Sequence, residues 1–198
     1  MSPWSHKGSL RTMSERALTE KGEQAVPDIR TVLELLRPLY PDPVPLLSYE
    51  NPYQLMVAVA LSAQTTDAQV NAVTPELFRT FPDPVSLMVA EPSEVERIIH
   101  SVGFFRSKAK SIIAAAAMLV RDFDSVLPRR IDELVKLPGI GRKSAGVLLT
   151  HLYEEPALIV DTHFGRVTRR LGYTDAKDAN RIERDCAEQM PRALWAEA

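Results

Sequence analysis

Two residues in the segment 137–163 have side chains suited to covalent chemistry: Lys143 and Asp161. A lysine amine is a nucleophile only when it is neutral, and an ordinary lysine is almost fully protonated at neutral pH. Burial, or the neighbouring cations Arg142 and His163, would raise the neutral fraction. A carboxylate alone would lower it, so Asp161 is better suited to accept a proton from Lys143 or to stabilise a developing positive charge.

The spacing between these two residues allows them to meet. The 17 residues from 144 to 160 are enough for one helix, a loop through Pro156 and the start of a second helix. An antiparallel return of this kind can bring both side chains to the same cleft. The spacing is therefore compatible with a shared site for Lys143 and Asp161.

The turn before Lys143 has the composition of an anion site. Gly139 and Gly141 remove the Cβ atoms that would keep a phosphate away, and glycine permits backbone angles that other residues avoid. The first amides of the following helix have no acceptor within the helix and carry the positive end of its dipole. Arg142 and Lys143 add positive charge, so we expect this turn to bind a phosphate.

Five pieces of the chain together resemble a known family. They are Asn51-Pro52-Tyr53, Leu61-Ser62-Ala63-Gln64 with Asp67, Gly103 followed by Ser107-Lys108-Ala109, Leu137 to Lys143, and Asp161 to His163. The fourth piece matches the helix-hairpin-helix signature. Because the pieces occur in order over roughly residues 29–195, the sequence closely resembles the endonuclease III family of DNA glycosylases.

The resemblance implies an activity and a partner. In this family the lysine at the position of Lys143 attacks the anomeric carbon, expels the base and forms a Schiff base, and β-elimination then cuts the strand on the 3′ side. The carboxylate at the position of Asp161 is essential. The expected substrate is double-stranded DNA with an oxidised pyrimidine or an abasic site.

The resemblance also implies roles for residues that contact DNA. Gln64 matches the glutamine that fills the space left by an extruded base, although a glutamine at a helix end also caps its neighbours. Phe104 stands where relatives commonly carry a leucine wedge, and its alternative place is the core. Lys108 has the position of a phosphate contact or of a solvated residue. His163 is expected either to bond within the cleft or to be structural.

Hydrophobic spacing predicts an all-α fold, because strand-like alternation is nowhere sustained. We expect helices near 29–39, 52–63, 67–81, 93–99, 107–121, 130–136, 142–153, 160–171 and 178–190, with Asp28, Asp67 and Ser93 as caps. The resemblance places a six-helix bundle at about 45–155, with the hairpin at 131–152. It assembles a second helical domain from residues 27–44 and 156–198, and residues 1–26 read as a disordered extension.

Charge and cysteine content add further limits. The net charge is −2, but residues 97–170 hold 13 Lys and Arg against 7 Asp and Glu. Cys186 is the single cysteine, which excludes an internal disulfide. Relatives hold a 4Fe-4S cluster with four closely spaced cysteines in a segment that lies beyond residue 198, so the cluster is implied by the family while its ligands are missing here. A monovalent cation at the hairpin is a further expectation.

Several alternatives stay open at this stage. The chain could be a hairpin module that binds DNA without catalysis, or an inactive shortened relative. The lesion could instead be mismatched thymine or uracil, adenine opposite a damaged purine, or an alkylated base, although the lysine argues against the adenine enzymes. No apolar run approaches the length of a membrane span. We expect a soluble, cytoplasmic monomer that starts at Met1 or Met13.

Overall fold

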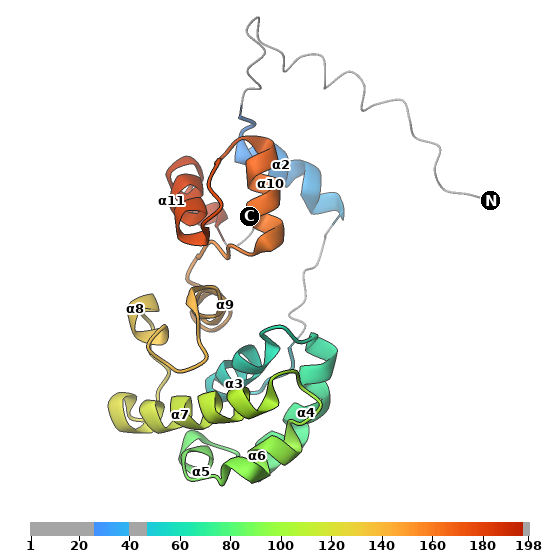
Figure 1. Ribbon diagram of the computed structural model, residues 1–198. Coiled ribbons are helices and arrows are strands. Elements are labelled where there is room, and N and C mark those ends of the chain that lie inside the picture. The colour runs from blue at the N-terminus through green and yellow to red at the C-terminus, as the bar shows by residue number, and fades with distance from the viewer. Residues whose placement is uncertain (1–25, 40–46, 196–198) are drawn as a thin grey trace, which may run out of the picture. The chain divides into compact units, whose positions relative to one another are not determined.

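The computed structural model describes residues 26–39 and 47–195, and these residues confirm the all-α prediction. They divide into two compact units (Figure 1). One unit contains residues 26–39 and 160–191, and the other contains residues 47–159 and 192–195. The predicted extension, apart from Val26, lies outside the described residues, as do residues 40–46.

The larger unit is built around one buried helix. Its helices are α3 (Pro52–Ser62), α4 (Asp67–Thr80), α5 (Pro84–Met88), α6 (Pro92–Ile98), α7 (Phe105–Phe123), α8 (Ile131–Leu134) and α9 (Arg142–Tyr153), with a 3-10 turn, η2 (Arg192–Leu194). Every residue of α3 from Tyr53 to Leu61 is buried, as expected for a helix that is apolar all round. α3 packs against α4, α7 and α9, and α7 packs against α5 and α6 (Figure 1).

The ends of several helices differ from the predicted ones for local reasons. The side chain of Thr66, not that of Asp67, accepts the Gln69 amide at the start of α4. α6 begins at Pro92, and Ser93 is not its cap because the capping position is Glu91, which makes no side-chain cap bond. α7 begins at Phe105 instead of Ser107.

α5 was missed by the sequence prediction, although its start carries a capping box. The side chain of Asp83 accepts the Ser86 amide at 2.7 Å, and Ser86 Oγ accepts the Asp83 amide at 3.3 Å. Pro84 stands in the first turn, where its missing N–H costs nothing. Five residues are too few to show a helical period, so only the capping signal could have revealed this helix.

The smaller unit combines segments from distant parts of the chain. Its elements are α2 (Ile29–Leu36), η1 (Arg37–Leu39), α10 (Thr162–Leu171) and α11 (Ala179–Gln189). Asp28 caps α2 as predicted, since its side chain accepts the Arg30 amide at 2.9 Å. The Tyr173 hydroxyl donates to the Pro27 carbonyl at 2.5 Å, which ties α2 to the segment between α10 and α11. The buried apolar residues of this unit are Ile29, Leu33, Tyr173, Ile182, Cys186 and Met190.

Candidate nucleic-acid interface and active site

The hairpin contains a tight turn, residues 137–140, whose two end residues are buried. The Ile140 amide donates to the Leu137 carbonyl at 3.0 Å, with Pro138 second and Gly139 third in the turn. Gly139 has a φ of +84°, the conformation that the third position of a type II turn requires. Leu137 and Ile140 are both buried, so the two ends of the turn are fixed in the core.

Gly139 also marks a close contact between the hairpin and its neighbours. A Cβ built on Gly139 would lie 3.1 Å from Cβ of Ser111 in α7 and 3.7 Å from Cβ of Ala60 in α3. The hairpin therefore lies directly against both helices. Ser111 was missed by sequence reasoning, because only the fold brings residue 111 to residue 139.

Gly141 differs from Gly139, because it does not use the backbone angles that only glycine adopts easily. Its φ is −85°, which any residue adopts. Within the part of the chain that the structure describes, no atom outside its immediate chain neighbours lies within 4 Å of a Cβ built there. Because Gly141 has no side chain, the space in front of α9 stays open to an approaching phosphate.

Lys143 and Arg142 stand in the first turn of α9, directly after this glycine, and both are exposed. The first amides of α9 have no acceptor within the helix, and the positive end of the helix dipole lies there. An anion such as a phosphate is therefore stabilised at this point.

Asp161 caps α10, which belongs to the smaller unit. Its Oδ1 accepts the Phe164 amide at 2.8 Å, and its side chain is half-buried. The cap orients the carboxylate and places it at the positive end of α10, which stabilises its negative charge. Lys143 and Asp161 lie in different units, so their meeting in one cleft stays a prediction.

His163 follows in the first turn of α10 and is exposed. Its Nδ1 lies 3.1 Å from Nη2 of Arg166. Because a guanidinium only donates, Nδ1 is the acceptor in this pair. The two expected roles of His163, a bond within the cleft or a structural position, stay predictions.

Gln64 and Phe104 lie in two adjoining turns of the larger unit. Both have left-handed backbones, with φ of 55° and 58°, and both are exposed. Phe104 is 70% exposed, so its alternative place in the core is wrong. A Cβ on Gly103 would lie 3.7 Å from the Gln64 carbonyl oxygen, which shows how closely the two turns approach.

Lys108 does not have its predicted role. Its side chain is buried, and Nζ donates to the Leu61 carbonyl at 2.8 Å and to Thr65 Oγ1 at 2.7 Å. Its ammonium is therefore directed into the protein, and neither a solvated position nor a phosphate contact is compatible with these bonds. The sequence could not show this, because the partners lie 47 and 43 residues away.

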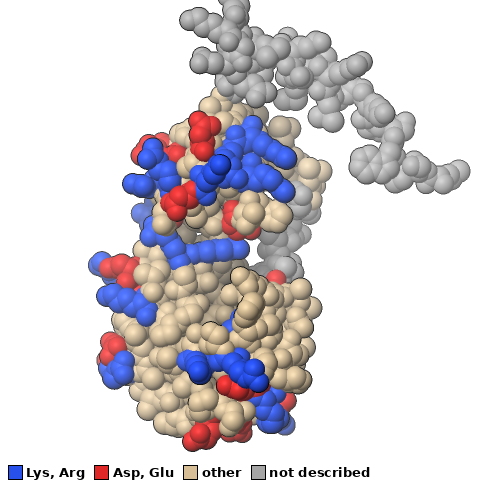
Figure 2. Space-filling model, viewed as in Figure 1, with Lys and Arg blue, Asp and Glu red and all other residues tan. Residues whose placement is uncertain are grey.

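Several basic residues of the segment 97–170 are paired with acidic ones, two of which, Glu76 and Glu96, lie outside the segment. Ion pairs join Arg97 to Glu76, Arg106 to Glu96, Arg121 to Asp122, and Arg130 to Asp132, at 3.2, 3.9, 3.2 and 2.9 Å respectively. Figure 2 accordingly shows acidic side chains beside many of the basic ones on the larger unit, with wide uncharged areas between them.

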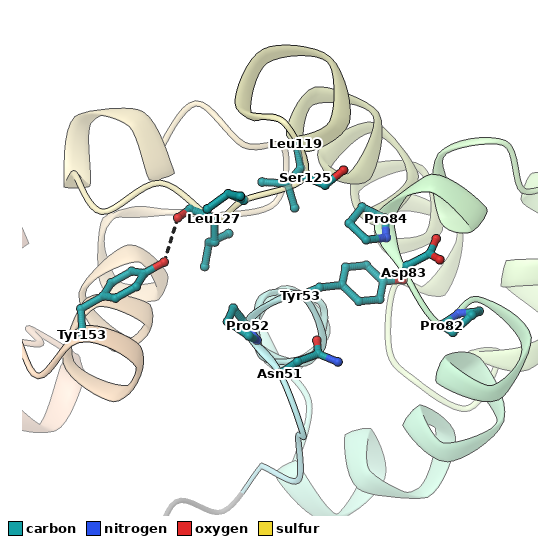
Figure 3. A pocket seen from close by; sticks show the side chains of 11 residues that line it. Asn51, Pro52, Tyr53, Pro82, Asp83, Pro84, Leu119, Ser125, Leu127 and Tyr153 are labelled. Atoms are coloured by element: carbon teal, nitrogen blue, oxygen red, sulfur yellow. Dashed lines mark hydrogen bonds between the residues drawn. The ribbon is translucent and has the colours of Figure 1, made fainter.

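The larger unit also has an open cavity of about 350 Å³, whose lining includes Tyr53, Leu127 and Tyr153 (Figure 3). None of the predicted site residues lines it. The Tyr153 hydroxyl donates to the Leu127 carbonyl at 2.8 Å, and the Tyr53 hydroxyl donates to the Phe81 carbonyl at 3.1 Å. Burial raises the pKa of Tyr53, so its hydroxyl stays protonated. These polar groups hold the local structure together, and they give the cavity no reactive group.

The residues present do not fit an iron-sulfur cluster. Cys186 is the single cysteine of the chain and is buried, which raises the pKa of its thiol. No group of three or more metal-binding side chains occurs among residues 26–39 and 47–195. Within those residues there is also no helix of the length and apolarity needed to cross a membrane.

Comparison with known proteins agrees with this geometry. The sequence model of the HhH-GPD superfamily base excision DNA repair proteins matches residues 57–192. Endonuclease III of Synechocystis sp. is 47% identical over 165 residues, which cover 83% of this chain and 75% of that protein. Endonuclease III of Bacillus subtilis is 40% identical over 169 residues, which cover 85% and 77%.

Solved structures are similar as well. A trapped endonuclease III–DNA covalent intermediate has a TM-score of 0.80 and 39% identity, covering 85% of this chain and 80% of that chain. A thermostable thymine-DNA glycosylase has a TM-score of 0.69 at 19% identity, which shows a shared fold alone.

Proposed function

The chain belongs to the endonuclease III family of base excision DNA repair glycosylases, and from that premise we propose that it is bifunctional, removing an oxidised pyrimidine and then cutting the abasic site. Its partner is DNA. The observation that supports the proposal best is the placement of Lys143. It is an exposed lysine in the first turn of α9, next to an open, glycine-lined approach for a phosphate.

In the proposed reaction the neutral amine of Lys143 forms a bond to C1′ of the deoxyribose while the bond from C1′ to the base breaks. The base leaves with a proton, and opening of the sugar ring gives a protonated imine. Loss of a proton from C2′ then expels the 3′ phosphate, and water releases the enzyme. The relative trapped as a covalent DNA intermediate is 39% identical to this chain, which supports a covalent route.

Asp161 is proposed to accept the proton that Lys143 loses and to stabilise positive charge on the sugar. Its cap with the Phe164 amide supports this role, because the bond fixes the carboxylate at the start of α10. Substitution by Asn would keep the cap and remove the charge. Asp161→Asn therefore separates the chemical role from the capping role.

Gln64 and Phe104 are proposed to fill the gap left by the extruded nucleotide. Both are exposed, and they stand on neighbouring turns of one unit. A glutamine can bond to the orphaned base, and an exposed aromatic ring can wedge between base pairs. Their shared placement supports a single insertion site formed by both turns.

The experiment is borohydride trapping on duplex DNA with an abasic site. The unsubstituted chain and Lys136→Ala should give a covalent adduct, because Lys136 is an exposed lysine of the same hairpin that has no role in the reaction. Lys143→Ala should give none. If a folded, DNA-binding chain gives no adduct in any form, the hairpin is a binding module and the lyase proposal is wrong.

Lesion choice is tested on the same duplex with thymine glycol, mismatched thymine or mismatched uracil in place of the abasic site. The proposal predicts excision of thymine glycol in preference to the mismatched bases. Faster excision of a mismatched base would keep the enzyme class and change the substrate.

A further inference from the structure

Lys108 is a buried lysine for which the proposed reaction gives no direct role. Its side chain is 8% exposed, and its hydrogen bonds are to a backbone carbonyl and a hydroxyl. Among the described residues, no carboxylate forms an ion pair with it. A buried ammonium without a carboxylate partner is unusual and requires a physical reason.

The first reason lies at the end of α3. This helix ends at Ser62, and carbonyls in a last turn lack helical donors and carry the negative end of the dipole. Lys108 Nζ donates to one of them, that of Leu61, at 2.8 Å. A lysine at this point caps the helix from a neighbouring element.

The second reason lies in the turn that follows α3. Nζ also donates to Thr65 Oγ1 at 2.7 Å, so the same ammonium holds residues on both sides of Gln64. Gln64 has a φ of 55°, a conformation that a non-glycine residue keeps only when its surroundings enforce it. The two bonds of Lys108 are positioned to enforce it.

The backbone of Lys108 is bonded to the second turn. Its amide donates to the Phe104 carbonyl at 3.0 Å, and Phe104 has a φ of 58°. Gln69 Nε2 adds a parallel link by donating to the Ser101 carbonyl at 2.9 Å. One residue thus joins the turn that carries Gln64 to the turn that carries Phe104.

The burial of Lys108 has an energetic cost that must be weighed against its two hydrogen bonds. It disfavours the charged ammonium and lowers the pKa of Lys108. The desolvation cost offsets much of the gain from the two hydrogen bonds, and an apolar side chain of similar length would fill the same space. Lys108 therefore contributes to geometry more than to stability.

We propose that Lys108 is a positioning residue for base extrusion, which holds the Gln64 and Phe104 turns in the one arrangement that inserts into the duplex. The inference rests on the proposed function, because it assigns those turns to the base gap. The lysine itself contacts neither DNA nor the reacting atoms.

The test compares Lys108→Met with Lys110→Met, an exposed lysine two residues along α7. Two readouts are taken: excision of thymine glycol from a duplex, and cleavage of an abasic site in single-stranded DNA, where no base pair needs to be opened. Loss of the charge-assisted bonds should slow duplex excision by about 10- to 100-fold. Single-stranded cleavage by Lys108→Met, and both activities of Lys110→Met, should stay within about twofold.

Direct observation of extrusion separates this inference from the proposed function. A 2-aminopurine base opposite the lesion should brighten when the unsubstituted chain binds, even without catalysis, and should brighten less with Lys108→Met. A bright signal without any adduct at Lys143 would contradict the proposed lyase and keep the positioning role. Full brightening and full duplex excision with Lys108→Met would overturn the positioning role alone.

If Lys108→Met does not fold, Thr65→Val tests the positioning role of Lys108 instead. It removes the hydroxyl acceptor and leaves the lysine and its bond to Leu61 in place. We expect the same selective loss on duplex DNA with a smaller amplitude. An equal fall in the duplex and single-stranded activities of a folded Thr65→Val chain would overturn the inference.

Discussion

At the scale of single residues, Gly139 and Gly141 look equivalent in the sequence and are different in the structure. Gly139 has a φ of +84° and would bring a Cβ to 3.1 Å from Ser111. Gly139→Ala should therefore lower the free energy of unfolding by about 2 kcal/mol, from left-handed strain and crowding together. Urea denaturation measures this loss, and an unchanged midpoint would show that the turn adapts at no cost.

For Gly141→Ala we expect the opposite result, an unchanged stability and a weaker affinity for DNA. Its φ of −85° and the open space around it should leave the free energy of unfolding within about 0.5 kcal/mol. The added methyl group would stand where a phosphate approaches, so affinity for duplex DNA should fall about tenfold, the equivalent of one lost backbone contact. Unchanged affinity in a fluorescence anisotropy titration would remove Gly141 from the interface.

The residue types indicated the chemistry but not the partners of each side chain. Lys143 and Asp161 stand out by their motifs, whereas the bonds of Lys108 come from the fold and could not be read from residue types. The same holds for His163, whose Nδ1 accepts from Arg166. Burial and hydrogen bonding over long sequence distances decide these cases.

At the scale of elements, one observed helix cap and one expected cap that the structure does not show can be tested as a pair. The side chain of Asn51 accepts the Gln54 amide at 3.0 Å and so caps the central helix α3. Asn51→Ala should cost about 1 kcal/mol. Ser93→Ala should cost less than about 0.5 kcal/mol, because Ser93 lies inside α6 and does not cap it.

Thermal and urea unfolding of both variants measure this difference. Equal destabilisation would mean that the cap of α6 had been assigned to the wrong residue. A stable Asn51→Ala chain would show that burial alone fixes the start of α3.

Helix positions were predictable where the chain shows a long apolar period. α4, α9 and α11 follow that period, α3 is recognisable as a continuous apolar run, and each of these helices begins within one residue of the expected start. α5 and the start of α7 were not predicted. α5 is too short to show a period, and α7 begins two residues early because Phe104 takes a left-handed conformation before it.

At the scale of the whole molecule, one acidic residue in α11, Asp185, should make the stability of the smaller unit depend on pH. The Thr174 hydroxyl and then the Arg181 guanidinium donate to Asp185, at 2.5 and 2.9 Å, and these bonds lower the pKa of Asp185 below its ordinary 3.8. A lowered folded-state pKa stabilises the fold above the unfolded value, and the stability is lost as pH falls through the folded value. The effect therefore belongs to the range below pH 3.8.

Asp185→Asn should make stability less dependent on pH in that range. Urea midpoints between about pH 2 and 5 should fall less steeply for Asp185→Asn than for the unsubstituted chain. Asp175→Asn, at an exposed position of the same unit, is the control and should leave the slope unchanged. Identical slopes for all three chains would remove Asp185 from the acid response.

The division into two units could be anticipated only from the family resemblance. Apolar periods show where helices lie but not which of them share a core, and the smaller unit joins residues 26–39 to residues 160–191. The bond between Tyr173 and Pro27 spans 146 residues, a separation that no local pattern reports. The placement of Lys143 against Asp161 stays a prediction for the same reason.

The central claim is that Lys143 forms the covalent bond to DNA, and its most direct test is to locate that bond. After borohydride reduction on abasic duplex DNA, the adduct is digested with protease and nuclease, and the modified peptide is sequenced by mass spectrometry. The account predicts a deoxyribose remnant on Nζ of Lys143. A remnant on Lys108, on Lys136 or on the terminal amine, with Lys143 unmodified, would contradict it.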